Sequence, residues 1–534
     1  MSPRPRFTTK IDQIRNALVG ALLRPLRWFS PRTQFLIGFS GLSVVTAAVL
    51  AHWPFTYRTL GVLPIVCLGY VVVWRFVRYR TASVDLLISR ERVFALMGSA
   101  ILVEATVMRL GFLMTDAIGA QSAAAPFDNP RTWSFAIPFA AAALLVRSLL
   151  DRQLSLFNGL ITAAMAATLA PKGAPLAIYA FISCAAAAYG IKRYRERQTV
   201  TIGGLIVAAI NIVAAIMITA AIQPRLRLLD LLIAGLFGFT GGLLTIVFAA
   251  GGVPINESLF GVLTDIRLLE LTNADLPVLS QLALRAPGTN QHSHAVGQLA
   301  EDACRAIGAN AMLARVGALY HDIGKVAAPE HFVENQSGEN PHDRLRPLQS
   351  AKIITSHVTY GLRLAKEIGL PKRVADFIPQ HHGTRTLHFF LSKAQAEGNC
   401  QINERDFRYP GPKPQFREAA ILMLTDSAEA AARSLAQPNQ ENIRTIVSRI
   451  FDAVVSDGQL DESQLTLHQL GQLRETIINS LMSIYHPRID YPGFNAPAHS
   501  EETPAHHLTY AQASEVPINA SGEVEEEAVP GRDS

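Results

Sequence analysis

Eight strongly apolar stretches follow one another in the N-terminal half of the chain and limit what this half can fold into. They lie at residues 35–53, 60–77, 93–114, 133–146, 156–170, 174–191, 201–222 and 231–252. A helix that spans the hydrocarbon core of a bilayer needs about 20 apolar residues, within a range of about 17 to 25. Several stretches meet this length, whereas 133–146 is short, and one or two stretches are expected to be tilted, paired or re-entrant. We therefore predict a polytopic α-helical membrane domain of about eight helices over residues 35–250.

The composition of the whole chain agrees with a protein that is partly dissolved in lipid. Of its 534 residues, 49% are hydrophobic and only 17% are charged, compared with about 25% charged residues in an ordinary soluble domain. The four cysteines are Cys67, Cys184, Cys304 and Cys400. None of them forms a CxxC pair, so neither a disulfide framework nor a zinc ribbon is indicated.

The distribution of basic residues predicts how the membrane domain is oriented. Arg and Lys are concentrated in the leader at residues 1–34 and in alternate loops, such as "KRYRER" at 192–197. The positive-inside rule therefore places the N-terminus in the cytoplasm, and an even number of spans returns the chain there near residue 251. Arg225 and Arg227 are the exception, because they lie in a loop on the predicted outer side. All outer loops are short, so we expect no folded extracellular domain.

Two features of this half leave alternatives open. Part of the leader is amphipathic and either lies on the anionic inner leaflet or is a solvated, disordered segment. Glu104 lies within the third apolar stretch. An acid inside a membrane marks a functional site by default, but an ion pair with Arg109 explains it equally well.

After residue 251 the chain changes character. Charged residues return, and apolar residues follow the helical period in segments such as 290–308, 310–322, 349–369, 372–382 and 416–436. We predict an all-helical cytoplasmic domain over residues 257–492, which makes the whole protein all-α. The tail at 493–534 is acidic and poor in apolar residues, so we expect it to be disordered.

Candidate metal ligands lie within the predicted helices of this domain or at their ends. His321 and Asp322 are adjacent in "GALYHDIGK", and Asp426 interrupts the apolar helix "AAILMLTDSAEAA". A single buried carboxylate is costly unless a cation meets it. Imidazole and carboxylate ligands without thiolates suit manganese, iron or another first-row metal. The complete candidate set is His292, His321, Asp322, His357, His381, His382 and Asp426.

This set resembles the HD superfamily of metal-dependent phosphohydrolases. The surrounding segments "ARVGALYHDIGK", "IITSHVTYGLRLAKEIGLP", "QHHGT" and "IYHPRIDYP" are similar to the seven-transmembrane HD-domain phosphodiesterases, which cleave cyclic di-AMP. The similarity is close over roughly residues 257–492 and looser in the membrane region. This sequence lacks the large extracellular domain that usually follows the first span in the family.

The resemblance implies roles for the candidate ligands. Asp322 would bridge two divalent metal ions, manganese or iron. His292, His321 and Asp426 would complete one site, and His357, His381 and His382 the other. Two metals about 3.5 to 4 Å apart lower the pKa of a water and clamp the attacking and leaving oxygens, so Asp322 counts as catalytic.

Further residues are weaker candidates. Lys325 lies within one helical turn of Asp322 and is expected to stabilise charge on the phosphoryl oxygens and to bind substrate; a solvated lysine at a helix end is the alternative. Arg385 is a weak candidate for the second phosphate. Asn335, Asn340 and Asp343 lie in a long polar segment, where turn-forming roles are at least as reasonable.

The resulting hypothesis is a multi-pass protein of the bacterial inner membrane, with its HD domain and both termini in the cytoplasm, that hydrolyses cyclic di-AMP to 5′-pApA. Its membrane region would act as a sensor or as a regulator of the phosphodiesterase. Expected partners are the cyclic dinucleotide and the lipid bilayer, with a homodimer as a candidate assembly and no nucleic-acid polymer. Alternatives are an HD hydrolase acting on cyclic di-GMP or guanosine tetraphosphate, and a non-catalytic nucleotide-binding receptor. A transporter ranks below these, because the apolar stretches contain few charges.

Overall fold

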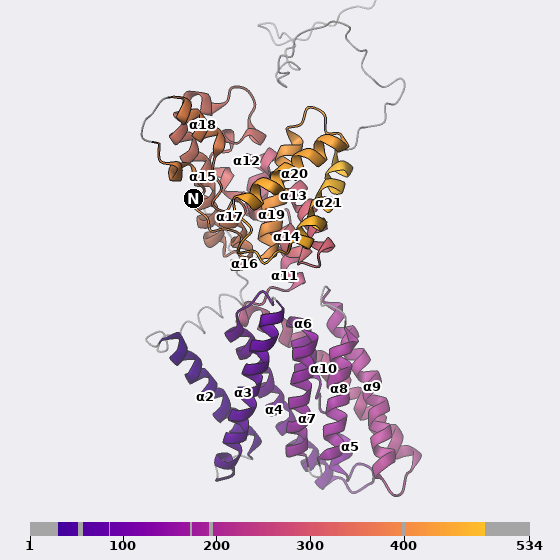
Figure 1. Ribbon diagram of the computed structural model, residues 1–534. Helices are drawn as coiled ribbons and strands as arrows, with labels where there is room; N and C mark the ends of the chain where they lie inside the picture. The colour runs from indigo at the N-terminus through magenta and orange to yellow at the C-terminus, as the bar shows by residue number, and fades with distance from the viewer. Residues whose placement is uncertain are drawn as a thin grey trace, which may run out of the picture. The chain divides into compact units, whose positions relative to one another are not determined.

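The computed structural model describes residues 30–51, 57–84, 86–170, 173–191, 196–397 and 402–485. Most of the basic leader and all of the acidic tail lie outside these described residues, so the predictions for them stay predictions. The described residues form α-helices, short 3-10 helices and one isolated β-bridge, and no strand occurs among them. The prediction of an all-α fold is therefore confirmed (Figure 1).

The described chain divides into two compact units. The first, here called the membrane unit, contains the described residues up to Asn273 together with Ala365–Val374. The second, here called the HD unit, contains Ala274–Leu364 and the described residues from Ala375 onward. The predicted start of the cytoplasmic domain at residue 257 lies inside the last long helix of the membrane unit, which ends at Phe260.

The membrane unit is an assembly of mostly long apolar helices. They are α2 (Pro31–Leu50), α3 (Tyr57–Ser83), α4 (Arg90–Gln121), α5 (Pro130–Ser134), α6 (Ala141–Leu149), α7 (Arg152–Leu169), α8 (Ala174–Gly190), α9 (Gln198–Ile222), α10 (Leu228–Phe260) and the short α11 (Asp265–Glu270). Five of the described helices, namely α2, α3, α4, α9 and α10, are long and apolar enough to cross a membrane. The predicted total of eight spans stays a prediction.

The fourth apolar stretch is the one that departs from a spanning helix. It forms two short helices, α5 and α6, separated by residues 135–140. Pro138 lies in this break, and a proline has no N–H to donate to the preceding turn. Backbone groups in the break have partners on α8: the Phe135 carbonyl accepts from the Tyr179 hydroxyl at 2.9 Å, and the Phe139 carbonyl from Cys184 Sγ at 3.1 Å. Irregular backbone at membrane depth is tolerated where it is buried in this way.

Glu104 also meets this broken segment. Its side chain is 2% exposed, and Oε2 accepts a hydrogen bond from the Ala142 backbone N–H, at the start of α6, at 3.1 Å. Among the described residues no ion pair joins Glu104 to Arg109. The alternative of a Glu104–Arg109 pair is therefore not observed, because the orphan N–H groups of a helix N-terminus attract the carboxylate instead.

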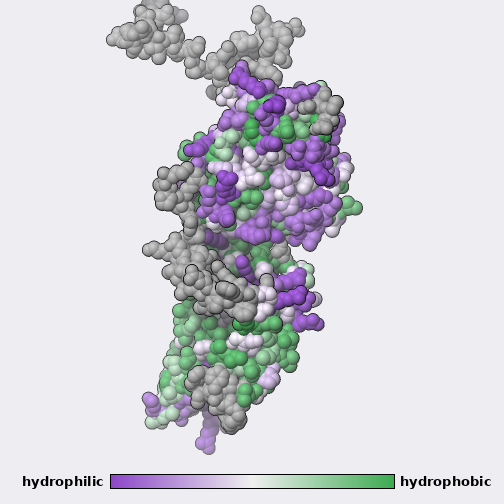
Figure 2. All heavy atoms as spheres, turned by 90° about the vertical axis from the view of Figure 1, so that its left-hand side faces the viewer, coloured by the Kyte–Doolittle hydropathy of each residue, from purple (hydrophilic) through white to green (hydrophobic). Residues whose placement is uncertain are grey.

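The outer surface of the membrane unit is apolar, and small residues bring its helices close together. Leu60, Ile65 and Val247 are 66–72% exposed, and hydrophobic residues cover much of the visible face of this unit in Figure 2. A Cβ placed on Gly242 of α10 would lie 2.3 Å from Ala208 Cα of α9. Such close backbone approach is characteristic of helix pairs in lipid.

The HD unit consists of shorter helices around a buried core. They are α12 (Pro277–Arg285), α13 (Pro287–Ala306), α14 (Ala311–Tyr320), η2 (Ile323–Ala327), η3 (Pro329–His331), η4 (Val333–Asn335), η5 (Pro341–Arg344), α15 (Pro347–Ile368), α16 (Lys372–Ala375), α17 (Phe377–Gln380), α18 (His388–Ala396), η6 (Glu404–Phe407), α19 (Arg417–Arg433), α20 (Gln440–Ser456) and α21 (Leu467–Ile484). Two of these helices also contain residues of the segment Ala365–Val374, which belongs to the membrane unit: α15 ends in this segment, and α16 begins in it.

Local sequence explains where several of these helices begin and end. Asn310 caps α14 by accepting from the Leu313 N–H at 3.1 Å. The segment predicted as one helix at 372–382 is instead α16 and α17, separated at Asp376. Pro379 accounts for the break, because its ring excludes the carbonyl of Ala375 and its nitrogen offers no hydrogen bond.

Candidate metal centre

All seven predicted ligands come together inside the HD unit, although five separate segments supply them. His292 lies on α13, His321 and Asp322 follow α14, and His357 lies on α15. The others directly follow α17 or lie on α19. They form two groups whose ligand atoms lie within 4.8 Å of one another: His292, His321 and Asp426, and Asp322, His357, His381 and His382. All are buried except His382, which is half-buried.

The Asp322 carboxylate lies between these two groups. Its Oδ2 is 3.0 Å from His321 Nε2, in the first group. Its Oδ1 is 3.4 Å from His357 Nε2 and 3.6 Å from His381 Nε2, in the second. The side chain of Asp322 is 2% exposed. One carboxylate thus reaches ligand atoms of both groups with its two oxygens.

Three imidazoles are held in one orientation by their own helices. In each, Nδ1 is placed to donate to a backbone carbonyl: His321 to Ala318 at 2.6 Å, His357 to Ile354 at 2.6 Å and His381 to Ile378 at 2.8 Å. This contact leaves Nε2 of a neutral ring as a bare acceptor, and it is the usual support of a metal-binding histidine.

The bare atoms provide a test of whether a metal fits. Within the described chain, the Nε2 atoms of His321, His357 and His381 and the Oδ1 atom of Asp322 are buried and have no hydrogen-bond partner. Acceptors buried this way are costly unless something positive meets them. Divalent cations held by the two groups would satisfy these atoms, and imidazole with carboxylate is a ligand set for first-row metals. The residues therefore fit a metal centre.

The ionisation states of the residues in the centre also fit a metal site. Burial alone would raise the pKa of Asp322, but the positive charges of His321 and Lys325 hold it well below its usual value. Burial lowers the pKa of His357 to about 4 and that of His382 well below the ordinary range. The carboxylate is thus ionised and these two rings are neutral at neutral pH, which are the forms that bind metals.

His321 differs from these two rings. Burial acts to lower its pKa, but the adjacent Asp322 and Asp426 carboxylates outweigh burial and raise the pKa to about 10. The two anions thus make the His321 ring a strong site for a positive charge. A proton and a metal ion compete for this place.

His292 has supporting residues that sequence reasoning did not identify. Its Nε2 is 2.9 Å from Asp426 Oδ1, while the Glu429 carboxylate contacts Nδ1 on the other side of the ring. Arg433 lies 3.1 Å from the same carboxylate. Asp426, Glu429 and Arg433 are spaced i, i+3 and i+7, so they share one face of α19. That spacing is the signal by which Glu429 was recognisable.

A glycine allows the His321–Asp322 segment to reach the neighbouring helix. A Cβ placed on Gly324 would lie 1.9 Å from the backbone carbonyl oxygen of His357. No side chain fits in this space, so η2 and α15 touch through their backbones. This close approach explains why a glycine follows the His–Asp pair and places Asp322 beside His357.

Lys325 lies directly against Asp322. Its Nζ is 2.8 Å from Asp322 Oδ2 and 2.7 Å from Glu334 Oε1, and it lies 4.9 Å from the centre of the Phe332 ring. Burial acts to lower its pKa, but the two carboxylates outweigh burial and raise it. The ammonium is therefore charged and fixed beside the centre. Glu334, on η4, was not recognised from the sequence.

The other weak candidates differ in their surroundings. Arg385 donates to Ser427 Oγ at 2.7 Å, next to Asp426 in the chain, so it lies near the centre. Asn335 is held by Thr289 through contacts of 3.1 and 2.8 Å, and Asn340 caps η5. These two amides thus have structural roles, and Asp343 is exposed.

One aromatic residue near the centre was also missed. Tyr409 stacks on the His382 ring, with ring centres 4.1 Å apart and an angle of 29° between the planes. Nothing in the sequence around "DFRYPGP" singled it out. It supplies a flat aromatic face at the half-buried side of the metal centre.

Two family models match consecutive parts of the chain. Residues 56–264 match the model described as "7TM receptor with intracellular HD hydrolase", and residues 289–431 match the HD domain. The first match covers α3 to α10 and leaves α2 outside. The second includes all seven clustered residues. The family resemblance found in the sequence is confirmed, and an HD domain implies binding of divalent metals.

Among curated proteins, two relatives called cyclic-di-AMP phosphodiesterase PgpH are similar. The Bacillus subtilis protein is 39% identical over 365 residues, or 67% of this chain and 51% of the relative. The Listeria monocytogenes protein is 38% identical over 368 residues, or 68% of this chain and 51% of the relative. The chain thus spans about half the length of the curated relatives that it matches.

A solved structure also matches part of the chain. It is the crystal structure of the L. monocytogenes PgpH HD domain in complex with cyclic di-AMP, at 46% sequence identity and a TM-score of 0.39. The match covers 40% of this chain and all of the solved one.

Proposed function

We propose that this chain is a metal-dependent phosphodiesterase that hydrolyses cyclic di-AMP to 5′-pApA. Its membrane region matches the family model of 7TM receptors that carry an intracellular HD hydrolase, and an HD domain follows that region. One observation carries the proposal: buried, bare imidazole nitrogens converge on the Asp322 carboxylate. The choice of substrate rests on relatives 38–39% identical that are called cyclic-di-AMP phosphodiesterases.

The centre is proposed to hold two divalent ions, manganese or iron. His292, His321 and Asp426 would hold one ion, His357, His381 and His382 the other, and Asp322 both. The separation of the ligands into two groups supports this assignment, and the position of Asp322 between them supports the shared role. When bound, such ions lower the pKa of water and neutralise charge on a phosphodiester.

The reaction converts a cyclic dinucleotide into a linear one. Water supplies the oxygen that joins phosphorus, one P–O3′ bond breaks, and the leaving 3′ oxygen takes a proton. Lys325 is proposed to stabilise negative charge on the phosphoryl oxygens, since its ammonium is fixed 2.8 Å from Asp322. Arg385 is proposed to contact the second phosphate. The Tyr409 ring offers a face on which an adenine base can stack.

The proposed location is the bacterial inner membrane, with the HD domain and both termini in the cytoplasm. The basic loops support this orientation. If each of the seven apolar stretches within residues 56–264 crosses the membrane, as α2 would, the number of crossings is even, as this orientation requires. A reporter that is active only in the periplasm, fused after residue 492, should be silent; activity there would overturn the topology. A homodimer remains part of the proposal, measured by the mass of the detergent-solubilised protein.

The activity is tested with the purified full-length protein, loaded with manganese or iron and offered cyclic di-AMP, cyclic di-GMP and linear pApA. We expect cyclic di-AMP to yield pApA, and prior chelation of the metal to abolish turnover. Equal or faster turnover of cyclic di-GMP would refute the substrate. Binding of cyclic di-AMP without turnover under any metal would favour the receptor alternative.

A further inference from the structure

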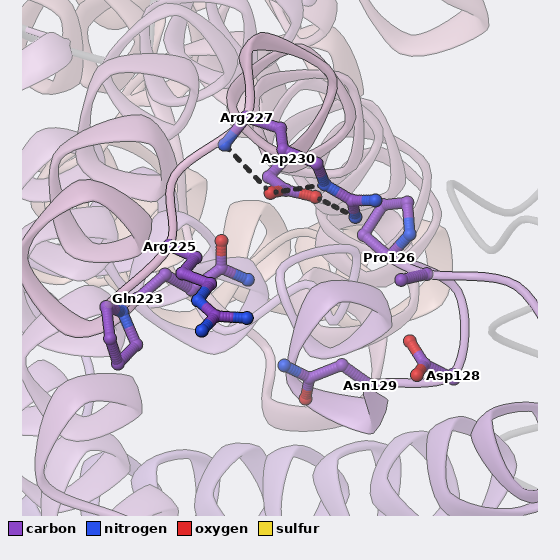
Figure 3. Close-up of a pocket in the computed structure, with 9 residues that line it drawn as sticks. Pro126, Asp128, Asn129, Gln223, Arg225, Arg227 and Asp230 are labelled. Atoms are coloured by element: carbon purple, nitrogen blue, oxygen red, sulfur yellow. Dashed lines mark hydrogen bonds and ion pairs between the residues drawn. The ribbon is translucent and has the colours of Figure 1, made fainter.

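A cavity opens at the end of the membrane unit where α4 and α9 end and α10 begins. It has a volume of about 590 Å³ and is formed by the loop between α4 and α5 and by the connection between α9 and α10. Small-molecule sites typically measure about 300–1,000 Å³. The polar and charged residues that line it are Asp128, Asn129, Gln223, Arg225, Arg227 and Asp230 (Figure 3).

One pair of charges in this cavity is already neutralised. The Arg227 guanidinium contacts both oxygens of Asp230, at 2.8 and 3.2 Å, and the Arg227 backbone N–H adds a third contact at 3.1 Å. Asp230 is 3% exposed. The Arg227 side chain therefore pairs with Asp230 in the first turn of α10. This ion pair explains the position of one of the two arginines that depart from the positive-inside rule.

The second pair of charges is open. The Arg225 guanidinium and the Asp128 carboxylate have no hydrogen bond or ion pair with another described residue. The Asp128 carboxylate attracts the Arg227 guanidinium only at longer range. Figure 3 shows Arg225 beside the Gln223 amide on one side of the cavity, with Asn129 and Asp128 on another. The cavity therefore offers one free positive and one free negative group.

Two amides add directed polar groups to these charges. Gln223 Oε1 is buried and has no hydrogen-bond partner within the described chain, so it lacks a donor that buried acceptors nearly always have. Asn129 Oδ1 already accepts from the Arg131 N–H at 3.1 Å. Its side-chain N–H groups remain as donors.

We propose that this cavity binds a small zwitterion, a molecule with one oxyanion group and one ammonium group. Arg225 holds the oxyanion, because a guanidinium pairs with carboxylate or phosphate oxygens through two parallel hydrogen bonds. Asp128, on the other side of the cavity from Arg225, receives the ammonium N–H groups. Two ligands share this chemistry at a membrane surface: a free amino acid and the headgroup of an ethanolamine phospholipid.

The position of the cavity gives such binding a consequence. The cavity joins the α4–α5 loop to the first residues of α10. This helix continues for 33 residues, about 50 Å at 1.5 Å per residue, and the chain reaches the HD unit at Ala274, after the short α11. A ligand that ties the loop to the start of α10 acts on the helix that leads to the HD unit. In the predicted topology the cavity faces away from the cytoplasm.

The test uses the full-length protein in detergent and measures binding by calorimetry. The probes are L-glutamine as a free zwitterion, O-phosphoethanolamine as the headgroup, and acetate and ethylammonium as half-ligands. We expect at least one zwitterion to bind more tightly than either half-ligand. Arg225→Ala should weaken that binding about 10- to 100-fold, as expected for a lost charge-assisted contact, and Asp128→Asn should remove the preference for the zwitterion over acetate.

Arg197→Ala is the matched control, because Arg197 is an exposed arginine of the same unit that pairs with Glu270; it should bind like the parent. Tight binding of L-glutamine identifies a soluble ligand, and binding of O-phosphoethanolamine alone identifies the headgroup. Binding that is equal in the Arg225→Ala variant, acetate that binds as tightly as the zwitterions, or no binding of any probe would each overturn the proposal. None of these measurements depends on the activity of the HD unit.

Discussion

The two units of this chain bury charged side chains in opposite ways. In the membrane unit each buried acid has one local partner: Glu104 Oε2 meets the start of α6, although Glu104 Oε1 has no hydrogen-bond partner among the described residues, and Asp230 meets Arg227. In the HD unit, seven titratable residues converge, and several ligand atoms are left bare toward one another. A buried acid is therefore a weak sign of a site by itself. Orphaned acceptors that face a common point are a much stronger one.

The largest expected effect comes from removing the shared carboxylate of the HD unit. Asp322→Ala should lower phosphodiesterase activity by at least about 10³-fold, since water at neutral pH is a poor nucleophile without the metals. The control is Asp452→Ala, which removes a surface acid paired with Arg474 and should keep parental activity. Turnover of cyclic di-AMP measures both variants. Near-parental turnover by Asp322→Ala would mean that the convergent bare acceptors of the HD unit do not mark a functional site.

Lys325 tests whether a buried charge at the centre acts on the substrate or only on its neighbours. Lys325→Ala should lower kcat about 10²- to 10³-fold while metal content is retained, the range for loss of one electrostatic stabiliser. The double variant Lys325→Ala with Glu334→Gln also removes the carboxylate that would be stranded. If the double variant regained activity, Lys325 would be a structural residue; a continued loss supports the role toward substrate.

Glu429 tests the support of the first ligand group. Glu429→Gln weakens the contact that orients His292, so the affinity of this group for metal should fall about 10- to 100-fold. The group around His357 should keep its affinity. Metal titration in the presence of a competing chelator separates the two groups, and a uniform loss from both would contradict independent support.

The smallest effect is expected in the membrane unit, at Glu104. Glu104→Gln keeps an acceptor for the Ala142 N–H and should leave the thermal midpoint of the full-length protein nearly unchanged. Glu104→Ala leaves this N–H without its partner and should cost about 1–3 kcal/mol. Thermal unfolding in detergent measures both. A large loss for Glu104→Gln would mean that the charge itself matters, and the membrane unit would then resemble the HD unit more than we propose.

What the sequence predicted differs between the two units for a physical reason. Apolar length identified the helices of the membrane unit, but not the break around Pro138. That break depends on Tyr179 and Cys184 from another helix, and no local pattern reveals those contacts. In the HD unit, residues that serve as ligands are chemically distinctive, so all seven clustered residues were found from sequence. Glu429 shares a face of α19 with Asp426, and that spacing offered a signal for it. Glu334 and Tyr409 belong to common residue types in other segments, and only the folded chain brings them to the centre.

The central claim is that Asp322 is shared by two metal ions, and the metal content of the purified full-length protein tests it most directly. The account predicts about two equivalents of manganese or iron in the parent chain. It predicts loss of both in Asp322→Ala, because each ion loses the shared ligand, whereas His357→Ala should mainly weaken one site. Two equivalents retained in Asp322→Ala, at near-parental activity, would contradict the account and leave Asp322 as a residue that only orients His321.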